Sequence, residues 1–140
     1  MLRKVAQIIR GHGHPYTLSR ELILKVLKNS AIPLSPKEIY QAIPEPKPNL
    51  ATIYRNLNLA EKIGLVRSVE LREGFKRYEM VKKGFHKHRI VCRVCRRIQS
   101  FTPKDCNLKV FENMITKQFG FMVDDHVLEF YGVCPNCQKK

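Results

Sequence analysis

Apolar residues recur at helical spacing in three stretches of the first half of the chain, at residues 18–28, 39–43 and 50–62. Residues 35–38 read Ser-Pro-Lys-Glu, a capping box with proline at the first helical position. Asn49 is a favourable N-cap for the last stretch, and Gly64 supplies a stop. The pattern predicts three helices, of which the third turns three apolar residues toward a core: Ile53, Leu57 and Ala60.

Two runs of β-type residues follow, at 65–71 and 75–80, and the Arg-Glu-Gly sequence between them predicts a hairpin. Three helices followed by a hairpin form the pattern of a winged helix-turn-helix. Residues 81–85 are polar and contain a glycine, which is typical of a hinge. We therefore predict a first domain over residues 1–80 and a hinge over 81–85.

The last part of the chain has a different character. Residues 86–101 read as short strands around two cysteines, 104–119 as a helix that ends at Gly120, and 121–131 as a partly alternating segment. We predict a second, small α/β domain over residues 86–140. The fold class is then α+β, with the winged helix-turn-helix at the N-terminal side.

The charge balance indicates a polyanionic partner. The 140 residues hold 26 basic and 12 acidic side chains, a formal net charge of +14, and nucleic acid is the commonest partner of such a protein. No apolar run is long enough for a signal-peptide core or a membrane span, so we expect no membrane partner and a cytoplasmic location. The sequence contains no phosphate loop, nucleophile constellation or paired-carboxylate signature, which favours a protein that is not an enzyme.

Four of the five cysteines form two C-x2-C pairs, separated by 38 residues: Cys92, Cys95, Cys134 and Cys137. Two such knuckles supply the four thiolates that structural Zn2+ favours, and cytoplasmic thiols stay reduced. The alternatives are a redox C-x-x-C motif and buried structural thiols, although a redox motif needs only one pair. The fifth cysteine, Cys106, is interpreted as a small half-buried residue.

Two further groups of residues have chemistry of interest. His86 and His88 would lie on the same side of a strand, and His126 could join them when the cysteine site closes, although an H-x-H motif alone is a weak signal. Tyr54 and Arg55 lie on the third helix, which a helix-turn-helix inserts into the major groove. Thr52 lies on the same helix and is a further candidate DNA contact. The alternative for Tyr54 is packing in the core. Phosphate contacts are expected from basic residues nearby: Arg20, Lys47, Arg67, Arg72, Lys76 and Arg77.

Three motifs occur together in order: Ala-Thr-Ile-Tyr-Arg-Asn-Leu at 51–57, Gly-Leu-Val at 64–66 and Tyr-Gly-Val-Cys at 131–134. Because these motifs occur together and in this order, the chain resembles the ferric uptake regulator family over residues 17–137. The resemblance implies a homodimeric repressor that binds a palindromic operator in double-stranded DNA when a divalent metal is bound, and so controls metal uptake or homeostasis genes. It implies zinc on the four paired cysteines, a dimerisation role for the second domain, and DNA contacts by Tyr54 and Arg55. The family's minor-groove lysine aligns with Pro15, for which Arg10, His14 and Arg20 are the candidate substitutes.

The resemblance also implies two metal-sensing sites, and the chain departs from both. At the first site its residues are Pro33, Glu79, Lys87 and Arg89, so three of four ligands are lost and we expect that site to be absent. At the second site the chain has His86, His88 and His126, with Asn107 at the carboxylate position and Asp105 two residues earlier. We interpret the three histidines, with Asp105, as the regulatory site. Its second divalent metal would be Zn2+, Fe2+, Mn2+, Ni2+ or Co2+, among which the sequence does not choose.

Three functions remain open at this point. The first is a metal-dependent repressor, in which metal on His86, His88 and His126 fixes the relative orientation of the two DNA-binding domains. The second is a DNA-binding protein of the same fold with structural zinc and no metal sensing, which Pro33, Lys87 and Arg89 motivate. The third is a thiol-based or peroxide redox sensor.

Overall fold

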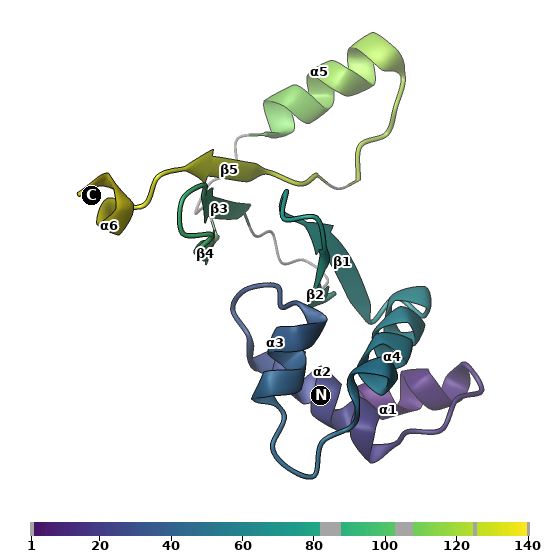
Figure 1. Cartoon of the computed structure of the whole chain (residues 1–140). Helices are drawn as coiled ribbons and strands as arrows, with labels where there is room; N and C mark the ends of the chain where they lie inside the picture. Colours follow the sequence, from purple (N-terminus) through teal and green to yellow (C-terminus); the bar gives the residue numbers. More distant parts are fainter. Residues whose placement is uncertain (1, 82–87, 103–107, 125, 140) are drawn as a thin grey trace. The chain divides into compact units, whose positions relative to one another are not determined.

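The computed structural model describes residues 2–81, 88–102, 108–124 and 126–139 (Figure 1). The chain forms two compact units, residues 1–83 and 84–140. His86, Lys87, Asp105, Cys106 and Asn107 lie outside the described residues, and so do the predicted hinge, apart from Val81, and the first residues of the helix predicted over 104–119.

The first unit is a winged helix-turn-helix preceded by one further helix. Its helices are α1 (Leu2–Gly11), α2 (Leu18–Asn29), α3 (Pro36–Ala42) and α4 (Leu50–Lys62). Strands β1 (Val66–Glu70) and β2 (Lys76–Met80) form the antiparallel wing. All three helices and the hairpin predicted from the sequence are present, and the fold class is confirmed.

Local side-chain chemistry sets the helix starts. The Ser35 hydroxyl accepts a hydrogen bond from the Glu38 N–H at 3.3 Å, and the Glu38 carboxylate accepts one from the Ser35 N–H at 2.7 Å, which completes the predicted capping box. Asn49 caps α4 by accepting from the Thr52 N–H at 2.8 Å. Gly64 adopts φ +72°, a left-handed conformation that favours glycine, and ends the α4 segment as expected.

Helix α1 was not predicted. Its apolar run is interrupted by Gln7 and was interpreted only as too short for a signal peptide, although Leu2, Val5, Ala6 and Ile9 have helical spacing. The structure shows why the helix forms: Val5 and Ile9, four residues apart, are buried in the core of the unit. That core is built mainly from the apolar faces of α2 and α4 and from wing residues, among them Ile23, Leu27, Ile53, Leu57 and Tyr78.

The wing is joined to the helices by backbone hydrogen bonds. Leu34, in the loop before α3, pairs with Tyr78 of β2, with N···O distances of 2.9 and 2.7 Å. This bridge adds a third short segment to the two-stranded wing. The wing is thereby held against the start of α3.

The second unit is a three-stranded sheet with one longer helix. Strand β3 (His88–Cys92) pairs antiparallel with β4 (Ile98–Phe101) and parallel with β5 (Glu129–Gly132). Helix α5 (Lys109–Phe119) ends at Gly120, which has φ +74°, and α6 (Pro135–Gln138) follows β5. The expected strand character over 121–131 was only partly right, because pairing with β3 starts at the Leu128 carbonyl and the described residues before it form no strand. His126 therefore precedes β5 and does not lie on it.

Within the described residues, no helix combines the length and the apolar character needed to cross a lipid bilayer.

Candidate metal centre and nucleic-acid interface

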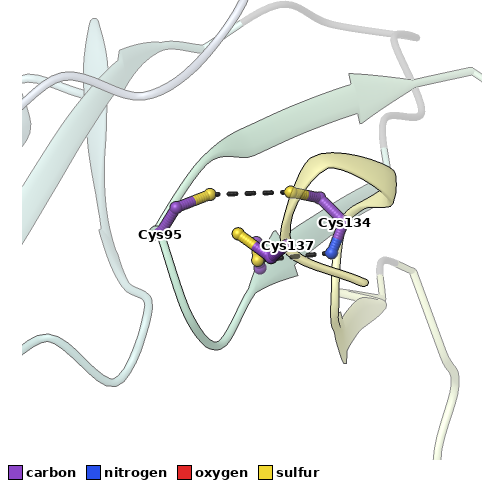
Figure 2. Close-up of side chains that lie close together, drawn as sticks. Cys95, Cys134 and Cys137 are labelled. Carbon is purple, nitrogen blue, oxygen red and sulfur yellow. Dashed lines mark hydrogen bonds between the residues drawn. The ribbon is translucent and has the colours of Figure 1, made fainter. Parts of the chain in front are cut away.

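The four paired cysteines converge at one end of the second unit. Cys92 ends β3, Cys95 lies in the turn that follows, Cys134 comes after β5, and Cys137 is in α6. Parallel pairing places Cys92 opposite Gly132, so the two knuckles meet. All four Sγ atoms lie within 4.8 Å of one another. Figure 2 shows the sulfurs of Cys95 and Cys134 facing each other, and their separation is 3.7 Å. Zn–S bonds of about 2.3 Å in a tetrahedron put the sulfurs roughly 3.8 Å apart, so the cluster suits structural zinc.

The close approach of the four cysteines also shifts the pKa values of their thiols in opposite directions. Backbone N–H groups of Cys95 and then Cys134 donate to the Cys92 sulfur and lower the pKa of that thiol to about 6. The hydrogen bond with Cys134 and then burial raise the pKa of Cys137 to about 12. The protein thus favours a thiolate at Cys92 while Cys137 keeps its proton. A divalent cation removes the conflict because it stabilises all four as thiolates.

Two of the three predicted regulatory histidines are described, and the structure brings them together. His88 is buried on β3, and its ring lies 5.7 Å from the ring of His126, with 29° between the planes. The Nδ1 atom of His126 is 2.7 Å from the Glu112 carboxylate of α5. Glu112 was missed from the sequence, where the carboxylate was sought at Asp105 and Asn107. Its position on the predicted helix was visible, but its pairing with His126 was not.

The described residues at the first metal-sensing site of the family form ion pairs or are buried. Glu79 accepts a hydrogen bond from Arg67 at 2.7 Å. Arg89 is 2% exposed, and its guanidinium is 3.8 Å from the Glu129 carboxylate. Pro33 is buried as well. The carboxylate and the arginine at these positions thus form ion pairs with neighbouring protein side chains.

Helix α4 presents the predicted recognition residues on the side away from the core. Tyr54 is 43% exposed and Arg55 is exposed. The Arg55 guanidinium donates to the Thr52 hydroxyl at 3.2 Å, so Thr52 supports Arg55. Arg20 has a different environment, because it donates to the side chain of Asn56 at 3.0 Å and to the Pro15 carbonyl. Arg20 thus ties the start of α2 to α4.

A hollow of about 370 Å³ lies beside Tyr54, between the start of α3 and the wing. Its wall includes two exposed lysines, Lys37 and Lys76, together with the aromatic rings of Phe75 and Tyr78. Lys37 was not among the residues expected to contact phosphate. Both lysines bring positive charge next to Tyr54 of α4.

Arg77, expected to contact phosphate, is instead buried at 6% exposure. It donates to both carboxylate oxygens of Glu73 at 2.6 and 3.2 Å, to Glu38 at 2.6 Å and to the Pro33 carbonyl at 3.3 Å. Burial alone would lower the pKa of Arg77, but the two carboxylates raise it overall. The expectation of a phosphate contact was wrong because two glutamates from different elements surround this guanidinium.

A winged helix-turn-helix with an exposed basic recognition surface, followed by a unit with a four-thiol metal cluster, defines a metal-binding DNA-binding regulator. The sequence model of the ferric uptake regulator family matches residues 12–131. The chain belongs to the ferric uptake regulator family. This confirms the family predicted from the sequence and, with it, the function of a metal-responsive transcriptional regulator; the members of such a family are not enzymes.

Individual relatives span nearly the whole chain. The ferric uptake regulation protein of Campylobacter upsaliensis is 33% identical over 144 residues, covering 100% of this chain and 90% of that protein. The peroxide operon regulator of Bacillus subtilis (strain 168) is 33% identical over 141 residues, covering 99% and 94%. Among solved structures, the ferric uptake regulator of Helicobacter pylori, described as having three functional metal binding sites, superposes with a TM-score of 0.82 at 27% identity, covering 99% of this chain and 92% of that one.

Proposed function

We propose that this chain is a homodimeric repressor whose affinity for a palindromic DNA operator is set by a divalent metal on His86, His88 and His126. The observation that carries the proposal is the 5.7 Å separation of the His88 and His126 rings, which come from segments 38 residues apart. An ion bonded to one nitrogen of each ring at about 2.0–2.1 Å would hold the centroids roughly 5 to 6 Å apart. The donor chemistry and the spacing therefore fit a transition metal or zinc.

The second metal of the proposal is a structural Zn2+ on Cys92, Cys95, Cys134 and Cys137. Its role would be to join the end of β3 to the segment after β5, because each of these two segments supplies one pair of sulfurs. This zinc would hold the second unit together. The regulatory metal would add a second link, between β3 and the segment before β5.

The DNA interface of the proposal is the exposed side of α4 with the hollow beside it. Tyr54 and Arg55 would reach base edges, with Thr52 supporting Arg55. Lys37 and Lys76 would neutralise backbone phosphates next to them. Arg20 is then a residue that holds α2 against α4, and its effect on DNA binding would be indirect.

The dimer contact of the proposal is the second unit. None of the residues of α5 is buried, and large apolar side chains are exposed there and on the neighbouring segments: Val110, Phe111, Met114, Phe119, Phe121, Met122 and Phe130. So many exposed apolar residues in a small unit indicate an interaction surface. A second copy is the partner that a two-fold operator requires, because each half-site takes one recognition helix.

The proposal keeps the predicted boundaries, with DNA binding by residues 1–80, a hinge at 81–85 and the metal and dimer functions in 86–140. It also keeps a cytoplasmic location, where the protein meets DNA and its thiols stay reduced. The target genes would serve metal uptake or homeostasis.

The test combines metal analysis with DNA binding. A binding duplex is first selected from random DNA with protein that carries metal. The dissociation constant for that duplex is then measured for the wild type and for His126→Ala, before and after mild chelation, with the zinc content per chain followed in parallel. We expect chelation to remove one ion and weaken DNA binding in the wild type, whereas His126→Ala binds weakly throughout and keeps its structural zinc.

A specific observation favours the second candidate, a DNA-binding protein with structural zinc only. Glu79 and Arg89 form ion pairs at positions where the family has metal ligands. That candidate predicts one ion per chain and DNA binding that mild chelation does not change. The redox alternative is less favoured, because all four sulfurs converge on one point whereas a redox pair needs two.

A further inference from the structure

Helix α5 has an exposure pattern that packing alone does not explain. Glu112 is its single acidic residue and its least exposed one, with 26% of the side chain accessible. The apolar residues Val110 and Phe119 are 70% and 62% exposed. Covering most of a carboxylate costs solvation, and a hydrogen-bond partner compensates for that cost.

The partner of Glu112 is His126. The distance from Oε1 of Glu112 to Nδ1 of His126 is 2.7 Å, and 22% of the histidine side chain is exposed. The two residues are 14 positions apart, so the contact joins the first turn of α5 to the segment before β5. The same imidazole stacks against His88 of β3. His126 is thus held between a carboxylate on one side and a second imidazole on the other.

The chemistry of this contact determines which nitrogen of the imidazole carries a proton. An ionised carboxylate only accepts hydrogen bonds, so Nδ1 carries the proton and the lone pair of the neutral ring is on Nε2. Histidines that bind metals commonly donate their second ring N–H to a carboxylate in this manner, which sets the tautomer, orients the ring and makes it a stronger donor.

We propose that Glu112 is a positioning residue of the regulatory metal site, which holds His126 in the tautomer and orientation that present Nε2 to the ion. This inference rests on the proposed function, because it takes His126 to be a metal ligand. Glu112 acts through His126 and does not itself bind the ion. It also connects the site to α5, the helix that carries the exposed apolar surface.

The experiment compares four variants of the full chain with structural zinc in place: Glu112→Ala, Glu112→Gln, His126→Ala and, as a control for loss of one negative charge, Glu70→Ala. Glu70 is exposed on the wing in the first unit. Co2+ is titrated in, and its visible absorption gives the dissociation constant. The absence of thiolate-to-cobalt charge-transfer absorption checks that the four cysteines keep their zinc. Thermal unfolding of each variant checks the fold.

Glutamine retains a carbonyl oxygen that accepts from Nδ1–H, whereas alanine does not. We therefore expect Glu112→Ala to weaken Co2+ binding by about 10- to 100-fold, Glu112→Gln to weaken it only a few-fold, and Glu70→Ala to leave it unchanged. Long-range 15N–1H NMR spectra of the His126 ring should report the Nδ1–H tautomer in the wild type and in Glu112→Gln. In Glu112→Ala they should report an increased fraction of the other tautomer.

Two results would overturn the inference while leaving the metal site intact. If Glu112→Gln binds Co2+ as weakly as Glu112→Ala, the carboxylate is itself a ligand. If neither variant weakens binding, Glu112 has no part in the site. A third result separates this inference from the proposed function: if His126→Ala binds Co2+ as tightly as the wild type, the histidine site itself is refuted and Glu112 loses its role with it.

Discussion

Replacing Arg77 with methionine tests how the wing is held against the helices. The guanidinium is buried and donates to Glu73, Glu38 and the Pro33 carbonyl. Methionine fills much of the same volume but leaves Glu73, whose side chain is 7% exposed, as an unpaired buried charge. Breaking such a pair by removing one partner costs about 3–5 kcal/mol. Since domains are commonly stable by only about 5–15 kcal/mol, the variant should lose a large part of the stability of the first unit.

The assay is urea unfolding followed by circular dichroism, with hydrogen exchange of amides in residues 50–80 to assign the change to the first unit. The matched control is Arg67→Met on the neighbouring strand. The Arg67 side chain is 40% exposed, although it also pairs with a glutamate at 2.7 Å. The partner, Glu79, is 15% exposed, so the pair is half-buried and the control should lose some stability. That loss should be smaller than for Arg77→Met, because the Arg67 guanidinium is more hydrated and exposed pairs contribute about 0–1 kcal/mol.

A double variant separates the loss of the ion pair from the cost of leaving the buried Glu73 carboxylate without a partner. Adding Glu73→Gln to Arg77→Met removes the uncompensated carboxylate, so part of the lost stability should return. The reasoning is refuted if Arg77→Met costs no more than Arg67→Met, or if Glu73→Gln makes the double variant less stable still.

Four further outcomes follow from the structure. Strong chelation of the zinc, or Cys95→Ser, should unfold the second unit, because the binding free energy of a structural zinc is folding free energy; circular dichroism and zinc content would check this. Lys37→Ala and Lys76→Ala should each lower the slope of log affinity against log salt by about 1, as loss of one phosphate contact does. Met114→Lys should weaken self-association at least tenfold in sedimentation experiments, because a lysine without a partner in an apolar contact costs more than about 1.4 kcal/mol. Burial alone would raise the pKa of Glu38, but the Ser35 and Arg77 hydrogen bonds lower it overall. The ionised Glu38 carboxylate therefore stabilises the fold above the ordinary carboxyl pKa, and this stabilisation is lost as the pH falls through the pKa of the folded state. The stability difference between the wild type and Glu38→Gln, measured by urea unfolding, should shrink in acid.

The elements of the first unit could be predicted because their signals are local. A capping box at residues 35–38, an N-cap at Asn49 and a stop at Gly64 lie within a few residues of the backbone groups they satisfy. Helix α1 was not predicted, although Leu2, Val5, Ala6 and Ile9 recur at helical spacing. The structure shows that Val5 and Ile9 are buried in a core formed with the other elements. Short helices of this kind are stabilised by packing more than by propensity.

The sequence by itself determined the winged helix-turn-helix and the two C-x2-C pairs that come together in the second unit, because periodicity, caps and C-x2-C spacing are properties of neighbouring residues. Only the tertiary structure decided which charges are buried. Arg77 is a basic residue of the kind that contacts phosphate, yet it forms an ion pair with Glu38, which is 39 residues away in the sequence. Glu112 likewise forms a hydrogen bond with His126, which is 14 residues away, because the tertiary structure brings the two side chains together. Whether a charged side chain faces solvent depends on the partners that distant elements bring to it, and a linear pattern does not contain that pairing.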